Sequence, residues 1–149
     1  MRIAQLLLQT DSGVVGFILR ITLAVVMFPH GAQKVLGWFG GHGFRGTMKS
    51  FTDSGIPAVF VLLAIAAEFL GSLGLAVGLL TCIAAFGIAC VMLVAIVTVH
   101  WPNGFFMNWY GNQKGEGFEY QLLASGIVIT LIIVGVGAWS LDGALVGPR

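Results

Sequence analysis

The sequence predicts an all-α integral membrane protein, a four-helix bundle with antiparallel transmembrane helices. The composition is the first reason: 58% of the 149 residues are hydrophobic and only 9% are charged, whereas a soluble domain carries roughly 25% charged residues. The mean hydropathy of +0.98 is the second. The third is the arrangement of the apolar residues in four long runs, at residues 13–39, 56–80, 82–100 and 119–141.

Each run is long enough to span a bilayer, since roughly 20 apolar residues of helix cross a hydrocarbon core. The first run holds Arg20, with His30 and Lys34 near its end, and the second holds only Glu68. The third has no charge before His100, and the fourth begins at Glu119. Because the runs are continuous rather than alternating, barrel strands are excluded.

The connections between the runs predict which ends share a membrane face. Runs two and three are separated by little more than Leu80-Thr81, whereas residues 40–55 and 101–118 form long connections. In a single domain over residues 1–149, both long connections therefore lie on one side and both chain ends on the other. The long connections contain Arg45, Lys49 and Lys114, whereas the chain ends contain Arg2 and Arg149. Because cytoplasmic loops carry more Lys and Arg, this count weakly favours long connections on the cytoplasmic side.

Several function classes are excluded. A net charge of +1 is not that of a nucleic-acid-binding surface. Cys82 and Cys90 lie eight residues apart in one run, about 12 Å along a helix, too far for a disulfide. Histidine, cysteine and carboxylate spacing indicates no metal site.

Two charges inside the spans form the first candidate site. Ionisable residues at membrane depth are costly unless paired and mark function by default. We expect Arg20 and Glu68 to differ in depth by a turn or two and to form an ion pair, directly or through water. The pair either locks two helices together or lines an internal polar pocket.

A second group lies at the long-connection end: His30, Lys34, His100 and Glu119. Arg20, Met27 and Lys34 recur every seven residues and share one helix stripe. If that stripe faces inward, a polar path runs from Lys34 towards Arg20 and Glu68. Aromatic residues surround its mouth, either as an interfacial belt or as the walls of a site: Phe39, Trp101, Phe105, Phe106, Trp109 and Tyr110. A quinone head group suits such walls. Haem b, with His30 and His100 as axial ligands, is a less favoured rival.

Small residues predict close helix packing in the second run. Gly74 and Gly78 form a GxxxG pattern, and Ala67 and Gly71 extend it by a turn. Such faces let backbones approach in lipid. Packing within the chain is favoured over a dimer seam.

Short motifs along most of the chain resemble the DoxX family. They are Arg20 with residues 28–34 (FPHGAQK) and 37–41 (GWFGG), then 55–57 (GIP), 67–71 (AEFLG) and Gly78-Leu79, and finally His100 with 104–106 (GFF) and 117–120 (GFEY). The resemblance implies a small four-helix protein of the bacterial inner (cytoplasmic) membrane. It also implies similarity to a subunit of thiosulfate:quinone oxidoreductase and to complexes that handle sulfur compounds or oxidative stress.

Together these observations favour a subunit of a membrane redox complex that offers a site for a quinone or for a protein partner. A non-catalytic scaffold and a carrier of small solutes or lipids stay open as alternatives. Whether the chain catalyses a reaction alone is not predicted.

Overall fold

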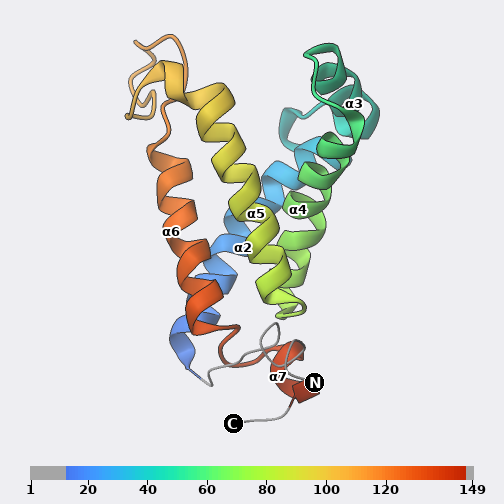
Figure 1. The fold of residues 1–149 in the computed structure, drawn as a ribbon, viewed down its shortest axis with the longest axis vertical. Helices are drawn as coiled ribbons and strands as arrows, with labels where there is room; N and C mark the ends of the chain where they lie inside the picture. The colour runs from blue at the N-terminus through green and yellow to red at the C-terminus, as the bar shows by residue number, and fades with distance from the viewer. Residues whose placement is uncertain (1–12, 147–149) are drawn as a thin grey trace.

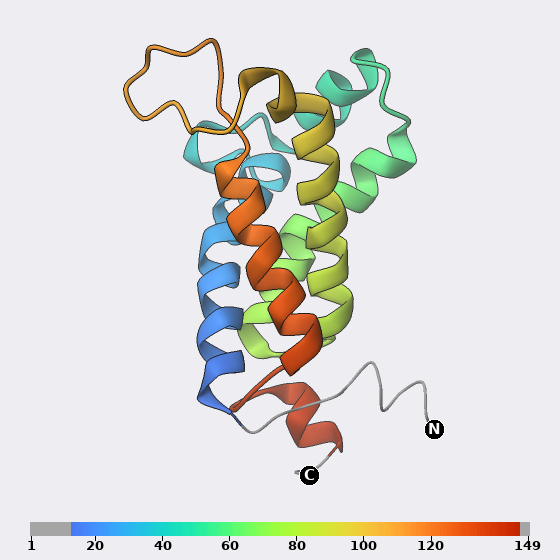
Figure 2. The ribbon, with the colours of Figure 1, turned by 60° about the vertical axis from the view of Figure 1, so that its left-hand side comes forward.

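A computed structural model describes residues 13–146. Four helices form the bundle: α2 (Val14–Val35), α4 (Ala58–Val77), α5 (Thr81–Ala95) and α6 (Glu119–Val134). In the described part of the chain, the short helices α3 (Gly43–Asp53) and α7 (Leu141–Val146) lie outside it. Figures 1 and 2 show α3 and the 104–118 loop at one end, the long-loop end, and α7 with the start of α2 at the other, the terminal end.

The fold is that of an all-α integral membrane protein, as the sequence predicts. Within residues 13–146, three helical segments are long and apolar enough to cross a membrane: Val14–Val35, Ala58–Val77 and Thr81–Asn103. The last includes α5, a π-helical turn η2 (Ile96–His100) and a 3-10 turn η3 (Trp101–Asn103). Helix α6 is apolar but has 16 residues, about 24 Å of helix.

The helices pack as a ring in the order α2, α4, α5, α6. The contact between α2 and α6, which we call the α2–α6 seam, is the least extensive of the four neighbouring contacts. The buried core includes Leu23 and Met27 of α2, Leu75 of α4, Ile88 of α5 and Val128 of α6. Large apolar side chains outside the core point outward on every helix, as expected of a surface in contact with lipid.

Small residues bring the helices together within the chain. A Cβ on Gly31 would lie 2.6 Å from the Cα of Phe69, so α2 and α4 touch through their backbones. A Cβ on Gly87 of α5 would meet the Ala67 side chain at 3.1 Å. A Cβ on Gly71 would meet Ala84 of α5 at 3.8 Å, so Ala67 and Gly71 of the predicted small face both lie against α5.

The fourth helix ends seven residues before the predicted boundary at 141. Gly135 and Gly137 both have positive φ, 88° and 75°, conformations that glycine adopts at little cost. The chain leaves the helix at Gly135, and a Cβ on Gly137 would lie 2.4 Å from the Phe17 nitrogen. The stretch after Val134 is thus irregular backbone packed against α2.

Residues 40–55, expected to be a connection, contain a regular helix, α3. It follows the 3-10 turn η1 (Trp38–Gly40) and ends at Asp53. Helix α4 then begins after Pro57, which fixes φ and suits a helix start. The terminal charges Arg2 and Arg149 lie outside the described residues.

Candidate functional site

The six residues predicted as an internal polar site occupy separate places. Arg20 lies towards the terminal end, whereas Lys34 and Glu68 meet in the long-loop half of the bundle. His100 and Glu119 contact residues of the 104–118 loop and of α6.

Arg20 is completely buried and binds backbone carbonyl oxygens. Its Nη1 donates to the carbonyls of Leu75 and Ala76, at 2.7 and 2.9 Å, at the end of α4. Its Nε and Nη2 donate to the carbonyls of Val136, Ala138 and Trp139 after α6. The last carbonyls of a helix lack partners in a following turn of that helix. Arg20 binds Ala76 there, and it binds Leu75 beside the Gly78 amide, which donates to the same carbonyl at 3.2 Å.

The predicted ion pair between Arg20 and Glu68 is wrong. Arg20 reaches α4 at Leu75, seven residues beyond Glu68, which is about 10 Å along the helix axis. Glu68 instead pairs with Lys34. Five carbonyl oxygens satisfy the guanidinium, and no carboxylate within residues 13–146 forms an ion pair with it.

Lys34 and Glu68 form an ion pair between α2 and α4. The Glu68 side chain is 6% exposed and that of Lys34 is 23% exposed, so the carboxylate lies inside the bundle and the ammonium group nearer its edge. The close backbone contact of Gly31 with Phe69 holds the two helices together beside this pair.

Two aromatic side chains adjoin the ion pair. The His30 and Tyr120 rings face each other across the α2–α6 seam with centroids 6.0 Å apart. His30 lies one turn before Lys34 on α2, so the two side chains are neighbours on that helix. The Tyr120 hydroxyl also donates to the Met27 sulfur at 3.6 Å. We call His30, Lys34, Glu68 and Tyr120 the mouth cluster.

The mouth cluster and Arg20 are not joined by a polar path. Arg20 and Met27 are buried and Lys34 half-buried, so the predicted stripe does face inward. Between Arg20 and Lys34, however, the interior is filled by Leu23, Ala24 and Met27, which pack with apolar residues of the other three helices. The continuous path inward from Lys34 is therefore wrong, because core side chains close it.

His100 lies apart from His30, on the π-helical turn that ends the third span. Its Nδ1 is 2.8 Å from the Glu116 carbonyl oxygen, and its Nε2 is 2.9 Å from the Gln121 amide nitrogen. In the neutral ring, Nδ1–H donates to the carbonyl and Nε2 accepts from Gln121. The Gln121 Oε1 is buried without a hydrogen-bond partner.

These contacts do not fit axial ligation of a haem iron by His30 and His100. An axial histidine needs one ring nitrogen free for the metal. Both nitrogens of His100 are occupied by protein groups, one of them a backbone carbonyl.

Glu119 and the loop aromatics do not join the mouth cluster. The Glu119 Oε1 accepts a hydrogen bond from the Trp109 indole at 2.9 Å, within the loop region. The aromatic residues predicted around the mouth are exposed, from 45% for Phe105 to 90% for Tyr110. They therefore have the exposure of an interfacial belt rather than of buried walls.

Sequence reasoning missed three residues that the fold uses. Tyr120 joins the mouth cluster, and Gln121 binds His100. Asp142, 1% exposed, accepts from the Leu80 and Thr81 backbone amides at the start of α5. One signal was available for Gln121, a lone amide inside an apolar run; none was available for Tyr120, which reads as an ordinary interfacial aromatic.

Comparison with known proteins gives a family model and one curated relative. The model described as DoxX matches residues 15–101, which include Arg20, the Lys34–Glu68 pair and His100. A Bacillus subtilis (strain 168) protein named "Putative oxidoreductase CatD" is 29% identical over 114 residues, covering 76% of this chain and 75% of that protein. No solved structure matches the chain.

Proposed function

Because the chain belongs to the DoxX family, we propose that it is a membrane subunit of a redox complex and binds a quinone head group at the mouth cluster. The carrying observation is the Lys34–Glu68 ion pair beside His30 and Tyr120 at the α2–α6 seam. The relative named as an oxidoreductase supports the redox part of the proposal.

The mouth cluster has the donors that a quinone requires. Quinone carbonyl oxygens accept hydrogen bonds, and Lys34, the Tyr120 hydroxyl and the His30 ring can donate them. Binding sites for such ligands combine apolar walls with a few polar groups. The seam supplies that combination, because core residue Met27 and the half-buried Tyr120 adjoin the polar side chains.

Proton exchange is the chemistry that these side chains contribute. Reduction of a quinone to the quinol takes two electrons and two protons. His30 and Glu68 can each hold and release a proton, and the exposed His30 is the member accessible from outside the bundle. The electrons come, in this proposal, from a protein partner in the bacterial cytoplasmic membrane.

Quinone binding is tested with the purified protein in lipid nanodiscs and decylubiquinone, followed by quenching of tryptophan fluorescence. We expect saturable quenching by the wild type and at least about tenfold weaker binding by Lys34→Met, the loss of one hydrogen bond to a charged donor. Lys49→Met on α3 is the matched control and should bind as the wild type does.

The alternatives give different results. A lipid carrier would retain lipid and show no saturable response to the quinone. A scaffold would bind neither lipid nor quinone, yet the Lys34→Met variant would no longer associate with the partner protein of the complex. Either result, or equal binding by Lys34→Met and wild type, refutes the quinone site.

A further inference from the structure

Helix α3 has three distinct faces. At 100° per residue, Phe44, Met48 and Phe51 share a sector of about 60°. Arg45, Lys49 and Thr52 occupy the sector beside it. Gly43 and Thr47 lie on the opposite flank of the aromatic sector, and Thr47 is the buried residue of the helix, 4% exposed.

The aromatic face of α3 is partly exposed. Phe44 is 45% exposed and Phe51 is 37% exposed, whereas Met48 is half-buried and Thr47 faces the protein. In a helix on the surface of a water-soluble protein, the large apolar side chains would face the core. Trp38 and Phe39, just before α3, are exposed as well, by 54% and 64%.

The position of α3 in the chain determines the depth of its aromatic face relative to the membrane. It lies between the end of α2 at Val35 and the start of α4 at Ala58, and both helices span the membrane. Figure 1 shows it at the long-loop end, on the side opposite the 104–118 loop. That is where the hydrocarbon core gives way to lipid head groups, the level that aromatic belts occupy.

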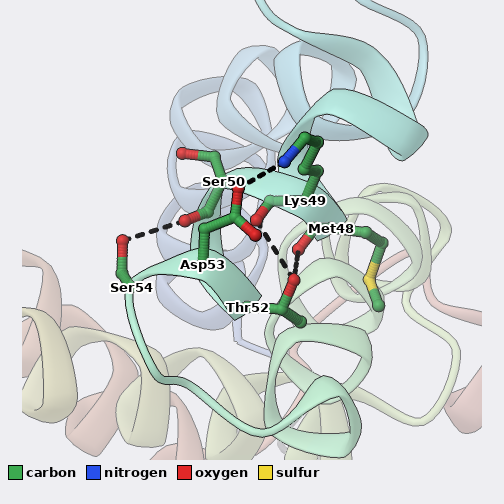
Figure 3. A network of polar contacts seen from close by, with 6 residues as sticks. All are labelled: Met48, Lys49, Ser50, Thr52, Asp53 and Ser54. Carbon is green, nitrogen blue, oxygen red and sulfur yellow. Dashed lines mark hydrogen bonds and ion pairs between the residues drawn. The ribbon is translucent and has the colours of Figure 1, made fainter.

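The basic face of α3 is available to an anion. Figure 3 shows Lys49 pointing to Asp53, its ion-pair partner at 2.6 Å, and both side chains are exposed. Arg45 is exposed too, and no carboxylate within residues 13–146 forms an ion pair with it. A guanidinium without a carboxylate partner can bind a lipid phosphate, while the aromatic face beside it contacts the acyl chains below that phosphate.

We propose that α3 is an interfacial helix that binds anionic phospholipid, with Phe44 and Phe51 in the acyl region and Arg45 on the phosphate. Amphipathic helices with basic and aromatic faces lie in this way at membrane surfaces. Lys49 adds to the attraction while sharing its charge with Asp53. This surface is separate from the mouth cluster and does not depend on the proposed quinone site.

Lipid selectivity tests the basic face. The protein is reconstituted in bilayers of equal phosphatidylglycerol and phosphatidylcholine, and retained lipids are counted by native mass spectrometry. We expect the wild type to retain phosphatidylglycerol preferentially and Arg45→Gln to lower that preference about fivefold, since one cation near an anionic surface is worth about 1 kcal/mol. Arg45→Lys should keep most of the preference.

Lys114→Gln, in the exposed 104–118 loop at the same end of the bundle, is the matched control and should leave the preference unchanged. An unchanged ratio in Arg45→Gln, or an equal loss in Lys114→Gln, overturns the proposal.

The depth of the aromatic face is tested by a nitroxide label on Phe51→Cys, in a chain with Cys82→Ala and Cys90→Ala. We expect collisions with oxygen, which is concentrated in lipid, to exceed those with a water-soluble nickel complex. The reverse order would place Phe51 in water, overturn the proposal and leave the face to a protein partner.

Discussion

Arg20 and Asp142 bind the two helix ends that flank the turn between α4 and α5. Arg20 donates to the last carbonyls of α4, and Asp142 accepts from the first amides of α5. The Asp142 amide also donates to the Gly78 carbonyl inside the turn. Both side chains are buried, so the terminal end of the bundle is closed by two buried charges of opposite sign.

Arg20→Ala should destabilise the protein strongly. Five carbonyl oxygens would lose the guanidinium, and only that of Leu75 keeps another donor, the Gly78 amide, among the described residues. Buried unpaired polar groups cost about 1–3 kcal/mol each. We expect a loss of at least about 3 kcal/mol in the free energy of unfolding, measured by titration with sodium dodecyl sulfate. Arg20→Lys should recover only part, since one ammonium group cannot reach the ends of both α4 and α6. A stability near wild type for Arg20→Ala would contradict this role.

Asp142→Ala should weaken the start of α5. The carboxylate accepts two backbone amides at 2.8 and 2.9 Å and sits at the positive end of the helix dipole. Loss of such a cap costs about 1–2 kcal/mol. The control is Asp53→Ala, an exposed carboxylate paired with Lys49, which should change the same titration by less than about 0.5 kcal/mol. Equal losses of stability in Asp142→Ala and Asp53→Ala would contradict a capping role for Asp142.

The sequence predicts the membrane bundle because lipid imposes long continuous apolar runs, and these are visible without coordinates. It also predicts that Arg20, Met27 and Lys34 share one stripe of the first helix, because helical spacing fixes a stripe, and the fold turns that stripe inward. It does not predict the partners of Arg20. Those partners are backbone carbonyls, which every residue carries, so no side-chain pattern marks them.

Two further differences have a common physical cause in glycine. The helix ending at Val134 and the helix beginning at Gly43 both adjoin glycines with positive φ, Gly135 and Gly43 itself. Whether a glycine packs within a helix, as Gly31 does, or ends one depends on the backbone of its neighbours. The same limit applies to the candidate site. The sequence identifies Lys34 and Glu68 as site residues, but it does not predict that they pair, because the pairing depends on the close approach of α2 and α4 at Gly31.

The Lys34–Glu68 pair should behave as a coupled unit. Lys34→Met or Glu68→Leu alone leaves one buried charge without its partner, which costs about 3–5 kcal/mol. The double variant should recover most of that loss, since apolar pairs often replace buried ion pairs at no cost. Additive losses in the detergent titration would contradict the pairing. A stable double variant that no longer binds decylubiquinone would separate the fold from the proposed function.

Thr81→Val should leave the protein as stable as the wild type or slightly more stable. The Thr81 hydroxyl oxygen is buried and has no hydrogen-bond partner among the described residues. Removal of an unsatisfied polar atom with retention of shape carries little penalty, and the backbone amide that binds Asp142 is unaffected. Thr81→Ser, which keeps the hydroxyl and loses the methyl, should be less stable by about 1 kcal/mol. A marked loss in Thr81→Val would reveal a partner for the hydroxyl.

Gly31→Ala should separate α2 from α4 and thereby disturb the mouth cluster. Its Cβ would lie 2.6 and 2.7 Å from backbone atoms of Phe69, which cannot move aside as a side-chain tip can, so we expect a loss of about 1–3 kcal/mol. Gly126→Ala on α6 is the matched control, because nothing lies within 4 Å of its Cβ and alanine favours the helix by about 0.5–1 kcal/mol. Since Lys34 is one turn beyond Gly31, Gly31→Ala should also weaken quinone binding, whereas Gly126→Ala should not. Equal stability and binding in the two variants would show that the close approach of α2 and α4 does not position the pair.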